Sequence, residues 1–269
     1  MKIVRNLLIL LCPGLFLILV SFSPAGKESL AVTKIVIDAG HGGKDPGTKG
    51  SYTKEKDVAL KVANLVGKYI EENIKGVEVI YTRKGDSLVE LEKRPEIANS
   101  HNSDLFVSIH ANSLPKGTPP ERKKEIKGVE VYVMGAQNTD RALEVAKREN
   151  SVILLEEDYE KRYDFDPQSE ESYILYNLTQ SAYQKNSLIL ASLIDEQLKK
   201  RAGRKSYGVK QSSLYVLWNT AMPSVLVEVG YLSNPIEEKE LNDPKVQAYI
   251  ASGIYRAVKE YKKTIDTQN

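Results

Sequence analysis

The chain has 269 residues, of which 41% are hydrophobic and 28% are charged, and its formal net charge is +2 at pH 7. This composition is typical of a globular protein with a substantial core, and it excludes a disordered or fibrous chain. The near balance of 38 basic and 36 acidic residues gives no reason to expect a nucleic acid as a partner.

The N-terminal segment has a different composition from the rest. Lys2 and Arg5 precede the apolar run LLILLCPGLFLILV, which is followed by the small residues Ser23 and Ala25. This order predicts a secretory signal peptide at residues 1–25, with cleavage after Ala25. The alternative is an uncleaved N-terminal anchor, because the run approaches the roughly 18 to 20 apolar residues that span a bilayer.

Either interpretation predicts an exported protein of the periplasm or cell envelope. We expect a linker at residues 26–33 and one domain at residues 34–265. Cys12 is the only cysteine, and bulky Leu11 before it argues against a lipid attachment site. Without disulfides, the exported domain must rely on its core or on a metal.

The first predicted strand, KIVID at 34–38, leads into the glycine-rich loop of VIDAGHGGKDPGT. Gly, Asp and Pro are turn formers, so a turn explains most of these letters. It does not explain His41, which has few neighbouring side chains in such a loop and is well placed to bind a ligand.

The rest of the chain alternates between short apolar runs and amphipathic segments. Further strands are predicted at residues 77–82, 104–110, 128–134 and 224–230, and helices at 55–73, 88–102, 187–201 and 243–263. This alternation predicts a single α/β domain with a mainly parallel central sheet flanked by helices. One polar span, at about 135–185, interrupts the pattern and predicts a helical insertion.

Four acidic or imidazole side chains stand near strand or helix ends. His41 and His110 follow predicted strands, Glu55 opens a helix, and Glu228 lies inside the apolar run SVLVEVG. The carboxyl ends of parallel strands meet at one edge of a sheet, so we expect these residues to converge. Two imidazoles and a carboxylate are ligands typical of a catalytic zinc. Taken alone, however, a glutamate in the first turn of a helix, such as Glu55, often only interacts favourably with the helix dipole.

Glu228 is hard to explain as a structural residue, because a carboxylate in an apolar strand is costly to bury unless it is paired, bound to metal or shifted in pKa. His101, in NSHNSD, is predicted to be an exposed loop residue.

Six ordered motifs resemble the zinc-dependent N-acetylmuramoyl-L-alanine amidases of the amidase 3 family, which hydrolyse peptidoglycan. They are DAGHGGKDPGT, EKDVALKVA, TRKGD, SIHANS, GVEVYV and VLVEVGYLSNP. The resemblance implies Zn²⁺ held by His41, Glu55 and His110, with Glu228 as the catalytic glutamate. One departure is Trp218, where many relatives carry a basic residue, which puts substrate contacts there in doubt.

The implied reaction is hydrolysis of the amide between N-acetylmuramic acid and L-alanine, for cell-wall remodelling or daughter-cell separation. The absence of a G-x-S-x-G motif, and of any cysteine beyond Cys12, agrees with metal-assisted hydrolysis. Two alternatives are another exported zinc peptidase or deacetylase and an inactive wall-binding relative. The second would lack a ligand or the glutamate, and all four residues are present.

The insertion has two interpretations. It is either a surface excursion that adds stability or wall contacts, or an element that covers the metal cleft until an activator protein removes it, as in relatives with an insertion at this place. The sequence RENS at residues 148–151 resembles that element. Glu149 is therefore predicted to approach the open zinc position, where a carboxylate is a suitable ligand.

Overall fold

The computed structural model describes residues 31–136, 139–177 and 182–267. The predicted signal peptide or anchor, and most of the linker, lie outside these residues. None of the helices in the described part of the chain has the length and apolar character needed to cross a bilayer.

A central six-stranded sheet organises the molecule, in the order β2-β1-β3-β6-β4-β5. Its strands are β1 (Lys34–Ala39), β2 (Glu78–Tyr81), β3 (Leu105–Asn112), β4 (Val129–Met134), β5 (Ser206–Ser212) and β6 (Ser224–Tyr231). Every neighbouring pair is parallel except β4 and β6, which are antiparallel. The prediction of a mainly parallel α/β sheet is therefore confirmed.

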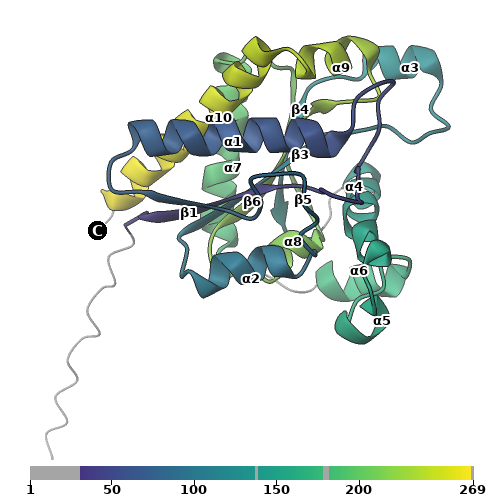
Figure 1. The fold of residues 1–269 in the computed structure, drawn as a ribbon, viewed down its shortest axis with the longest axis horizontal. Coiled ribbons are helices and arrows are strands. Elements are labelled where there is room, and N and C mark those ends of the chain that lie inside the picture. The colour runs from purple at the N-terminus through teal and green to yellow at the C-terminus, as the bar shows by residue number, and fades with distance from the viewer. Residues whose placement is uncertain (1–30, 137–138, 178–181, 268–269) are drawn as a thin grey trace, which may run out of the picture.

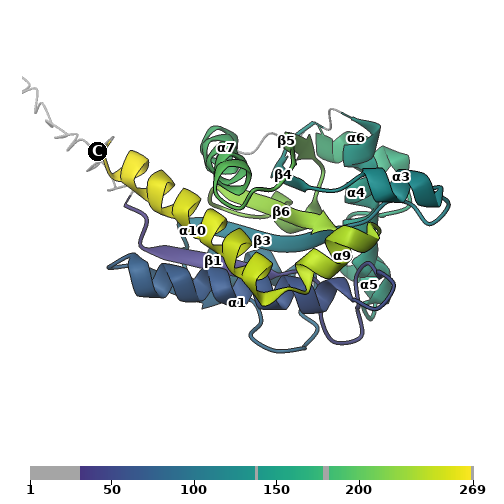
Figure 2. The same ribbon diagram turned by 90° about the horizontal axis from the view of Figure 1, so that it is seen from above.

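Helices cover both faces of the sheet, as the near-continuous apolar strands require. Three long helices, α1 (Glu55–Asn73), α7 (Gln184–Lys200) and α10 (Pro244–Asp266), pack on one face and share the larger core cluster with Ile35 and Ile37 of β1. Figure 2 shows α10 beside α1, with which it is in contact. The intervening Val36 points into a second cluster on the opposite face.

The second core cluster lies under shorter helices. Here α2 (Lys93–Ser100), α8 (Tyr215–Trp218) and α4 (Asp140–Asn150) pack against Phe106, Tyr132 and Leu226 of the sheet. The predicted insertion contains α4, a short 3₁₀ helix η1 (Ser151–Leu155), α5 (Tyr159–Arg162) and α6 (Glu170–Asn177). Figure 1 shows α4, α5 and α6 grouped at the end of the molecule away from the C-terminus. The remaining helices are α3 (Pro120–Glu125) and α9 (Pro235–Leu241).

One predicted helix starts later than expected, and one strand was not predicted. The helix predicted at 88–102 begins only at Lys93, because Pro95 lacks an N–H and is compatible only with the first turn of a helix. The edge strand β5 was missed, since its sequence SYGVKQS is only partly buried and carries little apolar signal.

Candidate metal centre and active site

The loop after β1 brings His41 to the edge of the sheet in a left-handed conformation, with φ of 59°. Close packing requires glycine at two positions of this loop. A Cβ at Gly40 would lie 2.4 Å from the ring of His110, and one at Gly47 would lie 2.6 Å from the ring of His41. These two positions therefore let both imidazoles approach each other and Glu55.

Two buried arginines hold this loop by its carbonyl groups. Arg83 donates to the carbonyl oxygens of Ala39 and Gly40 at 2.9 and 2.7 Å. Arg94 donates to those of Ala39 and His41 at 2.8 and 3.0 Å, and it pairs with the buried carboxylate of Asp38 at 2.8 Å. Since the donors are fixed guanidinium forks, the loop that carries His41 is rigidly supported.

Four side chains form a buried cluster at this edge. His41, Glu55, His110 and Glu149 each offer one ligand atom, and these atoms all lie within 4.8 Å of one another. Nε2 of His41 lies 3.1 Å from Glu55 Oε1 and 3.2 Å from Glu149 Oε2. Nδ1 of His110 lies 3.1 Å and 2.9 Å from the same two oxygens.

This arrangement fits a divalent metal ion with nitrogen and oxygen ligands. Among the described residues, His41 Nε2 and Glu149 Oε2 are buried without a hydrogen-bond partner, although they lie close together. A buried polar atom that is not hydrogen-bonded is costly, and a metal ion at this point would satisfy both atoms.

Neighbouring groups orient the candidate ligands. Asp45 Oδ2 lies 2.6 Å from His41 Nδ1, which turns Nε2 toward the cluster. The Glu55 carboxylate accepts hydrogen bonds from the backbone N–H groups of Thr48 and Ala111 at 2.8 and 2.9 Å. Sequence reasoning missed Asp45, which stands four residues after His41 and was interpreted only as a turn former.

Electrostatics inside the cluster is strongly coupled. Burial opposes the charged form of His110, but the carboxylates of Glu149 and Glu55 raise its pKa to about 9. Burial also opposes ionisation of Glu55, whose pKa is nevertheless lowered to about 2 by the nearby imidazole of His41 and by hydrogen bonds. The site therefore favours carboxylates facing a positive charge, which protons or a metal ion can supply.

Glu228 lies on β6 directly opposite His110 of β3, in register between the two parallel strands. It is fully buried, and burial together with the negative charges of Glu149 and Glu55 raises its pKa well above the usual 4.5, although Arg148 acts in the opposite direction. Such a shift is typical of a carboxyl group that exchanges protons at neutral pH.

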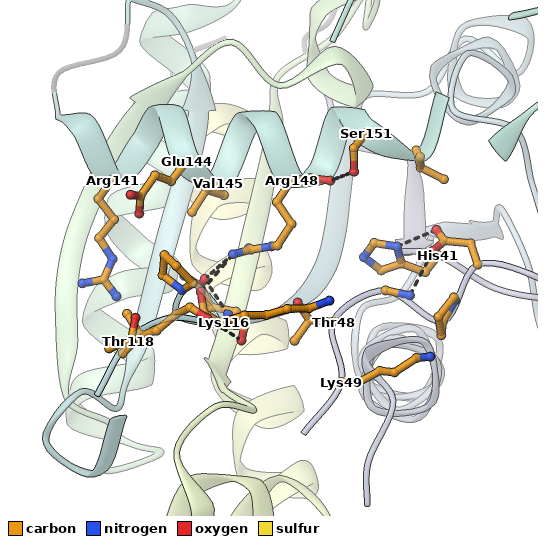
Figure 3. A pocket seen from close by; sticks show the side chains of 18 of the residues that line it. His41, Thr48, Lys49, Lys116, Thr118, Arg141, Glu144, Val145, Arg148 and Ser151 are labelled. Atoms are coloured by element: carbon orange, nitrogen blue, oxygen red, sulfur yellow. Dashed lines mark hydrogen bonds and ion pairs between the residues drawn. The ribbon is translucent and has the colours of Figure 1, made fainter. Parts of the chain in front are cut away.

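A cleft of about 1040 Å³ runs beside the cluster, between the body of the domain and the insertion. Residues 45–49 and 112–116 line one side, and α4 and η1 line the other (Figure 3). Trp218 does not line this cleft, since it packs partly buried near Tyr215 at the second core cluster. His101 is exposed at the end of α2, as predicted.

Two consecutive side chains of α4 project toward the cluster and Glu228. Glu149 is only 4% exposed and enters the cluster from the side of the insertion. Arg148 donates to Glu228 Oε1 at 2.9 Å and to Glu149 Oε1 at 2.7 Å. Sequence reasoning singled out the RENS segment but missed Arg148, because its partner lies 80 residues away on β6.

Comparison with known proteins extends this picture. A family model, Amidase_3, described as N-acetylmuramoyl-L-alanine amidase, matches residues 35–260. The chain is 33% identical over 248 residues to N-acetylmuramoyl-L-alanine amidase AmiA of Escherichia coli K12, which covers 91% of this chain and 81% of AmiA.

Solved structures that are similar to this chain are also amidases. The catalytic domain of CwlV, an N-acetylmuramoyl-L-alanine amidase from Bacillus (Paenibacillus) polymyxa var. colistinus, superposes with a TM-score of 0.61 at 28% identity, covering 85% of this chain and 97% of that one. The CwlD amidase of Clostridioides difficile, solved in complex with the GerS lipoprotein, gives 0.61 at 26% identity, covering 86% and 99%. The chain therefore belongs to the Amidase_3 family and is an N-acetylmuramoyl-L-alanine amidase that acts on peptidoglycan.

Proposed function

We propose that this amidase is a zinc enzyme, exported to the cell envelope, that its own insertion holds inactive. The observation that carries the proposal is the position of Glu149, a residue of the insertion, among His41, Glu55 and His110. The last three belong to the body of the domain, so they would hold zinc whether or not α4 is in place.

The proposed chemistry needs only a water molecule as nucleophile. When bound, zinc would supply a Lewis acid for the scissile carbonyl and would make water acidic enough to attack near neutral pH. Glu228 accepts a proton from the attacking water and transfers it to the amide nitrogen. The new C–O bond replaces the C–N bond, which leaves a carboxyl group on the muramic acid lactyl group and a free amine on L-alanine.

The insertion has contacts suited to an inhibitory role. Glu149 would occupy the position that the attacking water needs, and Arg148 pairs with Glu228, so both chemical functions would be blocked together. The segment after α4 is fastened to the body, where Glu156 accepts from the backbone N–H of Leu91 at 2.7 Å and Arg162 pairs with Glu90 at 2.7 Å. We infer that the resting enzyme is closed.

An activator protein would be needed to displace this insertion. The CwlD amidase, which has the same fold, was solved in complex with the GerS lipoprotein. This complex supports a protein partner for amidases of this fold, and we propose a partner for this chain that moves α4. Such control would suit an enzyme that cuts the wall of its own cell, during remodelling or daughter-cell separation.

A digestion of purified sacculi tests the proposal. The chain without residues 1–25 should release little free N-terminal L-alanine, and the same chain without the insertion should release much more. A chelator should abolish the release, and added zinc should restore it. New amino groups on residues other than L-alanine, or release that survives complete metal removal, would refute the proposed zinc-dependent reaction.

A further inference from the structure

Three hydrogen-bond acceptors of the domain body converge on the guanidinium group of Arg148. They are Glu228 Oε1 at 2.9 Å, Asn112 Oδ1 at 2.9 Å and the backbone carbonyl oxygen of Ser113 at 3.1 Å. Figure 3 shows Arg148 projecting from α4 into the cleft. Since the acceptors belong to β3, β6 and the loop after β3, they stay in the active site when α4 leaves.

Asn112 is held in one orientation. Its side chain is buried, and Nδ2 donates to Glu130 Oε2 at 2.8 Å and to the Tyr231 hydroxyl at 2.9 Å. A carboxylate only accepts hydrogen bonds, so the contact with Glu130 fixes which end of the amide is the donor. Oδ1 is therefore turned toward the cleft, where it accepts from the N–H of Ser113 at 2.8 Å as well as from Arg148.

Glu149 and Arg148 together present an oxygen acceptor and N–H donors to the site, as the carbonyl oxygen and the N–H of an amide would. Glu149 presents an oxygen to the two imidazoles at 2.9 and 3.2 Å, and Arg148 presents N–H groups to Glu228 and Asn112. The scissile amide likewise has a carbonyl oxygen to be polarised at the metal side and a nitrogen to be protonated by Glu228.

We propose that Asn112 Oδ1, the Ser113 carbonyl oxygen and Glu228 form the subsite for the leaving nitrogen of L-alanine. This inference rests on the proposed zinc-dependent reaction and assigns Asn112 to it as a further catalytic residue. As the C–N bond breaks and the nitrogen gains a proton, it becomes an amine and then an ammonium group with three N–H donors. Three converging acceptors match these donors.

The subsite would stabilise the transition state more than the substrate. The amide nitrogen of the substrate has a single N–H, whereas the departing nitrogen carries more donors and a growing positive charge. Hydrogen bonds to a charged donor are roughly twice as strong as those between neutral groups. Interactions that strengthen during bond cleavage accelerate the chemical step.

The test measures binding rather than turnover. In a zinc-loaded full chain that carries Arg148→Ala and Glu149→Ala, the side chains of these two residues no longer fill the subsite. Calorimetry compares its affinity for a synthetic peptide that begins with L-alanine and for the N-acetylated form of that peptide. Addition of Asn112→Ala should weaken binding of the free-amine peptide about tenfold, as expected for one hydrogen bond to a charged group. Binding of the N-acetylated peptide and the zinc content should not change.

The control variant is Asn73→Ala, which removes an exposed asparagine at the end of α1. It should leave both affinities unchanged. If Asn112→Ala does not fold, Tyr231→Phe removes one of the two groups that fix the Asn112 amide and should produce a smaller loss for the free-amine peptide alone. Unchanged preference for the free amine, or equal weakening of both peptides, would overturn the assignment.

The sacculus digestion separates this inference from the proposed function. Preference for the free amine that depends on Asn112, in a protein that releases no L-alanine from sacculi, would retain the subsite and refute the reaction. Release of L-alanine with no effect of Asn112 on the preference would retain the reaction and refute the subsite.

Discussion

The guanidinium group of Arg148 lies 2.9 Å from the carboxylate of Glu228, and the two residues come from segments 80 residues apart. Arg148 is followed in the chain by Glu149, whose carboxylate lies against both imidazoles of the cluster. A single turn of α4 therefore contacts both the proposed base and the proposed metal position. Each of these two contacts can be removed separately by substitution.

Substitution of either proposed inhibitory residue should raise basal activity. Glu149→Ala frees the position beside His41 and His110, and Arg148→Ala removes the cation paired with Glu228. We expect each variant to release L-alanine from sacculi severalfold faster than the parent without any partner, and Glu149→Ala to have the larger effect. Folded, zinc-loaded variants that are no more active than the parent would make the insertion a binding surface instead.

The variant Glu228→Gln should bind metal normally and lose turnover. The amide has nearly the shape of the carboxylate but cannot accept the proton of the attacking water, and proton transfer by a positioned group typically contributes about 10²- to 10⁴-fold. The measurement is sacculus digestion in a background that carries Glu149→Ala, beside metal analysis of the same preparation. Full activity in this variant would exclude Glu228 as the base.

Zinc affinity should distinguish ligands from the residue that orients them. His41→Ala and His110→Ala each remove one of three proposed protein ligands and should abolish stoichiometric zinc. Asp45→Asn leaves all three in place but weakens the contact with His41 Nδ1, so zinc affinity should fall by about 10- to 100-fold. Competition with a chromophoric chelator measures both effects. Stoichiometric zinc in either histidine variant would contradict its role as a ligand.

Without metal, the stability of the folded chain should fall as the pH rises. The pKa of His110 is about 9 in the folded chain without metal, against the usual 6.5, because Glu149 and Glu55 outweigh burial. Below about pH 6.5 both folded and unfolded chains hold this proton, and between pH 6.5 and 9 only the folded chain does. The free energy of unfolding should therefore fall as pH rises through this window, by up to about 3 kcal/mol.

Urea titrations at pH 6.5, 7.5 and 9 with a chelator present would measure this slope. It should be reduced in His110→Ala and retained in His101→Ala, which changes an exposed histidine. Saturating zinc should reverse the trend, since the metal competes with protons for the imidazoles and binds more tightly at higher pH. Equal slopes in the two histidine variants would contradict the assignment to His110.

Much of the fold follows from local sequence patterns. The helix α1 begins and ends where its apolar spacing predicts, at Glu55 and Asn73, and the side chain of Asp243 caps α10. The antiparallel pairing of β4 with β6 has no such local signal, because strand direction depends on connections elsewhere in the chain. The half-exposed edge strand β5 was missed for a related reason. Its extended conformation depends on pairing with β4, and its own sequence has no clear strand signal.

The residues of the site likewise fall into those that local sequence patterns predict and those that they do not. His41, His110 and Glu228 stand at or near the ends of recognisable strands, so their convergence follows from the parallel arrangement of β1, β3 and β6. The supporting residues do not follow from it. Asp45 resembles an ordinary turn residue, and the contacts of Arg148 and Asn112 depend on how α4 lies across the cleft.

The helix α4 also belongs to the second core cluster, where Ala142, Val145 and Ala146 pack with Tyr132 and Met134 of β4. Moving α4 aside would uncover apolar surface, at a cost of roughly 25 cal/mol per Å² exposed to water. If α4 inhibits the enzyme, spontaneous opening of the parent chain should consequently be rare, and its basal activity should be low. A partner that covers the uncovered surface would supply the missing apolar contact, so the response should be steep: silent without the partner and fully active with it.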